Sequence, residues 1–268
     1  MTKFEEFMKE RQYLLNVSPA TIRSYSLTFN FWLKIEQPTQ ADITAMIIKM
    51  RESGLRAVSV NHYLANIAAY LHWLGSDVRI KKLKEPQRIP QVFSKDDIHK
   101  IAAYKPTLDG QHRLQVLLLL LADTGVRISE ALGLEWQDVD FDNLLITVIG
   151  KGDKQRRIPF SYELRKFLWK FKTDTHWVFE SRVGTQINRH DVLRDTLLLC
   201  TRLGIKAPGR AIHAMRHSFA TAYIQRGGSV FGLQRCLGHT TITMSQRYCH
   251  LNTADLQAIH QKVSLLSR

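Results

Sequence analysis

The sequence is poor in acidic residues, in cysteine and in long apolar runs, and each shortage narrows the possible functions. Among 268 residues, 24 aspartates and glutamates stand against 38 lysines and arginines, which leaves a formal net charge of +14 at pH 7. Three cysteines are too few for a disulfide framework and fit the reducing cytosol. The longest apolar run, residues 116–122, is far shorter than the roughly 18 residues of a membrane span. The N-terminal segment has acidic residues where a signal peptide has basic ones, and it lacks the apolar region of a signal peptide, so we expect a cytoplasmic protein with no membrane contact.

The basic charge is spread over the whole chain rather than confined to one tail. The part up to Pro90 holds 13 basic and 8 acidic residues, a net +5, and the rest holds 25 and 16, a net +9. A basic balance favours nucleic acid as a partner, with simple solubility as the alternative interpretation. Within residues 79–97, two prolines, Pro86 and Pro90, interrupt a basic stretch that a helix cannot span; its bases are Lys81, Lys82, Lys84 and Arg88. We predict a first domain over residues 1–85, a linker over 86–93 and a second domain over 94–268.

The fold class expected from these patterns is mainly α, with one small β-sheet or hairpin. Ser18 and Pro19 match the N-cap and first turn of a helix, and three further helical segments make the first domain a four-helix unit. In the second domain, Ser94 and Asp97 form a capping-box pattern. A buried helix is expected up to a break at Gly125. Residues 144–160 are rich in β-branched side chains around a glycine- and lysine-rich centre, which predicts a β-hairpin.

Four short stretches combine polar, reactive side chains with glycine breaks and helix starts. They are TGVRISE with Arg127 and Glu130, GKGDKQRR with Lys151, HAMRHSF with His213, Arg216 and His217, and LGHTTITMSQRY with His239 and Tyr248. Each stretch taken alone is weak evidence of a functional site. An arginine three residues before a glutamate is most often a helix-surface ion pair worth less than about 1 kcal/mol.

Other chemistries that use such residues are disfavoured by the spacing. His213 and His217 stand four apart, as zinc ligands do, but Ala214 occupies the place of the glutamate that a metalloprotease requires, and no third ligand cluster follows. No G-x-S-x-G, Walker A or G-x-G-x-x-G pattern occurs. We therefore expect no metal and no cofactor.

Taken together and in this order, the four stretches resemble the motif boxes of the tyrosine recombinase (phage integrase) family. The resemblance covers about residues 94–250, and the basic helical first part is similar to the family's core-binding domain. Val126 and Met215 depart from the usual pattern, but each replaces one apolar residue by another. The resemblance implies a two-domain, C-shaped clamp that closes around duplex DNA.

The resemblance also assigns roles to six residues. Tyr248 would be the nucleophile that forms a 3′-phosphotyrosyl bond, and His213 would accept its proton. Arg127 and Arg216 would bind the non-bridging phosphate oxygens, for which their fixed N–H donors are suited. His239 would add a hydrogen bond to the same phosphate. Lys151 would protonate the departing 5′-oxygen.

Other residues near these motifs receive simpler interpretations. Glu130 is expected to orient its neighbours, His217 to be a supporting or core histidine, and Cys249 to pack rather than react. The helical spacing of Leu256, Ile259, Val263 and Leu266 predicts an amphipathic tail, which in this family often docks into a neighbouring protomer. We therefore expect a homo-tetramer in the synaptic complex.

The expected function is site-specific DNA recombination on a double-stranded site with an inverted repeat. The sequence offers no additional arm-binding domain, which favours a simple system such as plasmid or mobile-element resolution, integration or excision. Two alternatives remain. One is a type IB topoisomerase, which shares the residue set, and the other is a sequence-specific DNA-binding regulator that does not cut.

Overall fold

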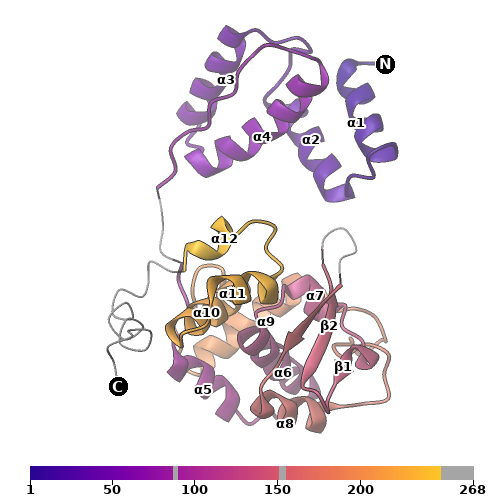
Figure 1. The fold of residues 1–268 in the computed structure, drawn as a ribbon, viewed down its shortest axis with the longest axis vertical. Helices are drawn as coiled ribbons and strands as arrows, with labels where there is room; N and C mark the ends of the chain where they lie inside the picture. The colour runs from indigo at the N-terminus through magenta and orange to yellow at the C-terminus, as the bar shows by residue number, and fades with distance from the viewer. Residues whose placement is uncertain (87–89, 151–154, 249–268) are drawn as a thin grey trace, which may run out of the picture. The chain divides into compact units, whose positions relative to one another are not determined.

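The chain separates into two compact units, Met1–Arg88 and Ile89–Arg268, each with its own hydrophobic core (Figure 1). The computed structural model describes residues 1–86, 90–150 and 155–248. The predictions for Lys151, for Cys249 and for the C-terminal tail lie outside these residues. The predicted fold class, mainly helical with a small sheet, is confirmed. None of the described helices is long and apolar enough to cross a bilayer.

The first unit is a cluster of four helices around aromatic side chains. Its helices are α1 (Lys3–Tyr13), α2 (Pro19–Phe31), α3 (Gln40–Glu52) and α4 (Ala57–Trp73). Ser18 caps α2 as predicted, because its hydroxyl accepts the N–H of Thr21. The fully buried ring of Phe7 lies edge-on to Tyr25, Phe29 and Tyr70, so the core joins three of the four helices.

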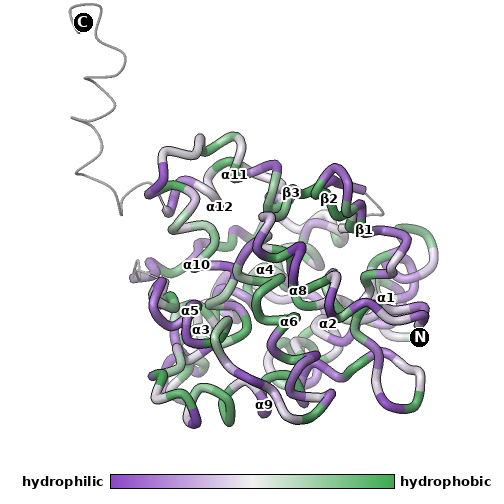
Figure 2. The backbone as a smooth tube through the Cα atoms, turned by 90° about the horizontal axis from the view of Figure 1, so that it is seen from below, coloured by the Kyte–Doolittle hydropathy of each residue, from purple (hydrophilic) through white to green (hydrophobic). Residues whose placement is uncertain are grey.

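The second unit is built around one buried helix. Its helices before the sheet are α5 (Lys95–Ala103), α6 (Asp109–Thr124), α7 (Ile128–Leu132) and the 3₁₀ turn η1 (Trp136–Asp138). Those after it are α8 (Tyr162–Phe171), α9 (Arg189–Arg202), α10 (Ala211–Gln225), α11 (Val230–Leu237) and α12 (Thr243–Gln246). Every side chain of α6 from Leu114 to Leu121 is buried, and much of this helix is hydrophobic in Figure 2. Helices α8 and α10 pack against it, which fixes α10 relative to the end of α6.

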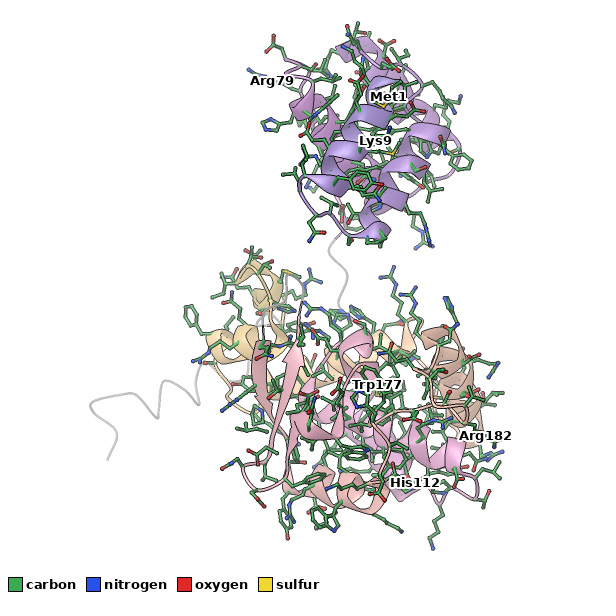
Figure 3. The ribbon with its side chains drawn as sticks, turned by 90° about the vertical axis from the view of Figure 1, so that its right-hand side faces the viewer. Met1, Lys9, Arg79, His112, Trp177 and Arg182 are labelled. Atoms are coloured by element: carbon green, nitrogen blue, oxygen red, sulfur yellow. The ribbon has the colours of Figure 1, made fainter. Side chains whose placement is uncertain are left out.

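The sheet has three antiparallel strands in the order β1-β2-β3. They are β1 (Val139–Asp140), β2 (Leu145–Ile149) and β3 (Gln155–Pro159), and the hairpin of β2 and β3 was predicted whereas β1 was not. Ile149 pairs with Gln155 at the end of the hairpin where the chain passes from β2 to β3. A separate bridge joins Glu135 to Trp177, which is labelled in Figure 3 and ties the segment after α8 to the segment after α7.

Two glycines in left-handed conformation place the loops that carry the candidate residues. Gly125 ends α6 at φ 66°, and a Cβ there would lie 2.3 Å from the ring of Phe219. Gly238 ends α11 at φ 62°, and a Cβ there would lie 3.0 Å from the guanidinium of Arg156. Because other residues adopt this conformation only under strain and no side chain fits the space, both turns require glycine.

Candidate active site

Arg127 stands at the N-terminus of α7, directly after the turn at Gly125. Its backbone N–H donates to Oε2 of Glu130 at 2.8 Å, and its Nη1 donates to Oε1 at 2.7 Å. Its Nη2 donates to the carbonyl of Gly238 at 3.3 Å, so the loops after α6 and α11 meet at this side chain. The side chain is 36% exposed, which leaves its guanidinium accessible to a ligand.

Glu130 is buried between two arginines rather than lying on a helix surface. Its side chain is 4% exposed, and besides Arg127 it binds Arg156 on β3 through two bonds of 2.9 and 2.8 Å. Burial by itself would raise the pKa of Glu130, but the hydrogen bonds from Arg156 and Arg127 outweigh it and hold the pKa below its usual value. The carboxylate is therefore ionised and orients both guanidinium groups. This agrees with the orienting role expected for it and corrects the surface-pair interpretation.

Arg216 is a buried cation held only by neutral acceptors. Its residue is 5% exposed, and its Nη1 and Nη2 donate to the carbonyls of Gly125 at 2.6 Å and Leu237 at 2.7 Å. Within residues 1–86, 90–150 and 155–248, no carboxylate forms an ion pair with it. Burial, followed by repulsion from Arg127, lowers the pKa of Arg216 to about 10, so it remains charged at neutral pH. A buried, unneutralised guanidinium beside a second arginine is suited to bind an anion.

His213 and His239 are neutral at pH 7 in this cationic setting. Burial and the positive charge of Arg216 lower the pKa of His213 below its usual value. The same two causes lower the pKa of His239 to about 4. His239 follows Gly238, and its Nδ1 lies 2.8 Å from the hydroxyl of Ser245 on α12. The neutral rings can each donate or accept a hydrogen bond at a bound phosphate.

Tyr248 follows α12, and its side chain packs into the small core formed by α10 and α11. Its ring joins a buried cluster of Ala220, Ile224, Leu233 and Leu237, and the residue is 2% exposed. Its hydroxyl lies 2.6 Å from Nδ1 of His217. Burial raises the pKa of Tyr248, although Arg247 and Arg216 act against the rise. The hydroxyl is therefore protonated at neutral pH, and a proton acceptor is needed for it to act as a nucleophile.

The structure thus brings five of the six predicted residues to the same region of the second unit. Arg127 and Arg216 are linked through the loops at Gly125 and Gly238, and Tyr248 contacts His217, which follows Arg216 on α10. Lys151 lies outside the described residues.

Sequence reasoning missed Arg156, and it did not predict the contact that His217 makes. Arg156 stands two residues before the fully buried Ile158 on β3, so the period of two along the strand places it on the inward side. That alternation could have identified it. His217 was expected to be a supporting or core histidine, and its contact with Tyr248 joins residues 31 positions apart. No local pattern predicts such a contact.

Comparison with known proteins identifies the family. The sequence model of the phage integrase family matches residues 91–255, which span α5 to α12 and all of the candidate residues. The protein belongs to the phage integrase family. As a member of this family of tyrosine recombinases, it is an enzyme that breaks and rejoins DNA strands.

Relatives of this phage integrase family member extend over both units. The tyrosine recombinase XerA of Pyrococcus horikoshii is 30% identical over 97% of this chain and 98% of its own length. XerC of Xanthomonas campestris is 30% identical over 84% of this chain and 74% of its own. The chain is therefore Xer-like along most of its length.

Solved structures show the same fold at lower identity. The Tn1549 transposon integrase in complex with transposon right end DNA has a TM-score of 0.78 at 18% identity and covers 98% of this chain and 100% of that one. XerH bound to a palindromic difH substrate has a TM-score of 0.75 at 17% identity. The match covers 99% of this chain and 85% of the XerH chain. XerA reaches a TM-score of 0.55 at 24% identity, with 98% of each chain covered.

Proposed function

We propose that this protein is a site-specific tyrosine recombinase that uses Tyr248 to cleave DNA at an inverted-repeat site. The hydroxyl oxygen of Tyr248 attacks the scissile phosphorus, and the bond to the 5′-oxygen breaks, which yields a 3′-phosphotyrosyl bond and a free 5′-hydroxyl. His213 takes the phenolic proton, and Lys151 supplies a proton to the departing oxygen. The bond energy kept in the phosphotyrosine allows the strand to be rejoined to another 5′-hydroxyl.

The observation that carries the proposal is the buried guanidinium of Arg216, which forms no ion pair among the described residues and directly precedes His217, the residue in contact with Tyr248. Arg127 and Arg216 would bind the non-bridging oxygens of the phosphate, and His239 would donate to the same group. A phosphodiester is the anion that this cationic, fork-shaped donor set matches, because it gains charge as the phosphorane forms. Each such donor is typically worth roughly 10²- to 10³-fold in rate.

Several finer assignments belong to the same proposal. The net charges of +5 up to Pro90 and +9 beyond it support a clamp in which both domains, residues 1–85 and 94–268, contact DNA on either side of the linker over 86–93. The palindromic substrate of XerH supports an inverted-repeat target, and the transposon end bound by the Tn1549 integrase supports a task on a mobile element. The spacing of the tail residues supports subunit exchange in a tetramer. Work on DNA is consistent with a cytoplasmic, nucleoid-associated protein that needs no cofactor.

The decisive experiment traps the covalent intermediate. The protein is first used to select its preferred duplex from a randomised DNA pool, and a nicked version of that duplex lets the cleaved strand diffuse away. The wild-type chain should form adducts that survive denaturing electrophoresis, whereas a non-cutting regulator binds the duplex and forms none. Vigorous relaxation of supercoiled plasmid that lacks the selected site would instead indicate a topoisomerase.

A further inference from the structure

The hydroxyl of Tyr248 is hydrogen-bonded to a histidine that is not among the six residues assigned above. Nδ1 of His217 lies 2.6 Å from Oη of Tyr248, and the two rings have their centroids 5.8 Å apart. His217 follows Arg216 directly on α10, so the backbone that places the phosphate-binding guanidinium also places this contact.

We propose that His217 is a positioning residue that holds the Tyr248 hydroxyl, through Nδ1, in the orientation from which it attacks the phosphate. This inference rests on the proposed function, since it assumes that Tyr248 is the nucleophile. It assigns to His217 a role separate from that of His213, the expected proton acceptor.

Both partners of the hydrogen bond are uncharged at neutral pH. Burial, then the neighbouring His213, Arg247 and Arg216, lower the pKa of His217 to about 4, so its ring is neutral at pH 7. Since the raised pKa of Tyr248 keeps the phenol protonated, the contact joins a phenol to a neutral ring, and the tautomer of His217 decides which atom donates. In the tautomer with the proton on Nδ1, the ring donates to the phenolic oxygen. That arrangement leaves the phenolic proton for His213 and a lone pair of the oxygen for phosphorus.

Both partners of the hydrogen bond are held in place by packing. The Tyr248 ring is enclosed by the apolar cluster of α10 and α11, and the His217 ring lies edge-on to His213 with centroids 4.8 Å apart. Packing defines where the phenol ring lies, and His217 defines where its O–H points. Among the residues that the structure describes, His213 makes no hydrogen bond to Tyr248, so His217 alone orients the hydroxyl in this state.

The two amide side chains provide a matched test of this role. Asparagine can place a polar atom near the position of Nδ1, whereas glutamine reaches the position of Nε2 instead. We compare His217→Asn, His217→Gln and His217→Leu by the single-turnover rate of adduct formation on the selected, nicked duplex, and by the dissociation constant for the same duplex without a nick.

The leucine and glutamine variants should react about 10²-fold more slowly than wild type, because a misdirected nucleophile loses rate of this order. The asparagine variant should stay within about tenfold of wild type, and all three should bind the duplex with unchanged affinity. Equal rates for asparagine and glutamine, or a wild-type rate for leucine, would overturn the proposal. An absence of adducts with the wild-type chain would reject the proposed function itself. Adducts that form at the same rate in wild type and in all three variants would reject only the role of His217. If the leucine variant fails to fold, the difference in rate between the asparagine and glutamine variants still tests the role of His217.

Discussion

Arg156 and Glu130 form a two-bonded ion pair in which each terminal guanidinium nitrogen contacts one carboxylate oxygen, at 2.9 and 2.8 Å. The same carboxylate binds Arg127, and Nε of Arg156 donates to the carbonyl of Cys236 at 3.0 Å. Glu130 thus joins α7 to β3, and Arg156 extends the network to the end of α11. The single negative charge of Glu130 leaves the group net positive, so the network supports an anion site without neutralising it.

Replacement of Glu130 by glutamine should destabilise the second unit by about 3 kcal/mol, because it leaves Arg156 largely buried without its counter-charge. Urea unfolding of the full chain measures this change. The matched control is Glu163→Gln, which removes an exposed pair with Lys166 and should leave the unfolding midpoint unchanged. Equal effects of the two substitutions would contradict the importance of the buried network.

Replacement of Arg216 by lysine should slow adduct formation by about 10²- to 10³-fold while duplex binding persists. An ammonium group cannot reproduce the planar fork that contacts the carbonyls of Gly125 and Leu237 and still presents donors to a phosphate. Arg226→Lys, an exposed change at the end of the same helix, serves as the control and should react at the wild-type rate. The measurement is single-turnover cleavage of the nicked duplex.

The free energy of unfolding should fall as the pH drops from about 6.5 to about 4. The pKa of His239 is about 4 in the fold, where burial and Arg216, Arg127, Arg247 and Arg156 disfavour its charged form, but about 6.5 in an unfolded chain. Between these values the unfolded chain binds a proton that the folded chain does not, so acid favours unfolding. His217 adds to the same effect.

Urea unfolding at pH 7 and pH 5 compares the wild-type chain with His239→Gln. The variant should lose part of the acid-induced fall in stability, because glutamine cannot take up the proton in the unfolded state. An identical fall in both proteins would show that the fold does not keep His239 neutral.

Local signals in the sequence predicted much of the fold. The hydroxyl of Ser94 and the carboxylate of Asp97 form the expected capping box at the start of α5, and Gly125 ends α6 in the left-handed conformation. The β2–β3 hairpin also follows its β-branched pattern. Strand β1 was missed because two residues are too few to show an alternating pattern, and it forms only through pairing with β2.

The candidate site could be predicted less completely, because part of it depends on long-range contacts. The motif order pointed to Arg127, Arg216, His239 and Tyr248, which do lie in one region. The ion pair of Glu130 joins residues 26 positions apart, and its burial depends on β3 packing beside α7 and α11. The pattern around Arg127 and Glu130 alone therefore suggested a surface pair.

The most direct test of the account identifies the residue that becomes attached to DNA. Adducts formed on the nicked duplex are trimmed with nuclease, digested with trypsin and sequenced by mass spectrometry. We expect the nucleotide to be attached to a peptide within residues 236–262, a range in which Tyr248 is the only tyrosine. We expect no adduct from Tyr248→Phe. A nucleotide on any other residue, or adducts that persist in Tyr248→Phe, would contradict the account.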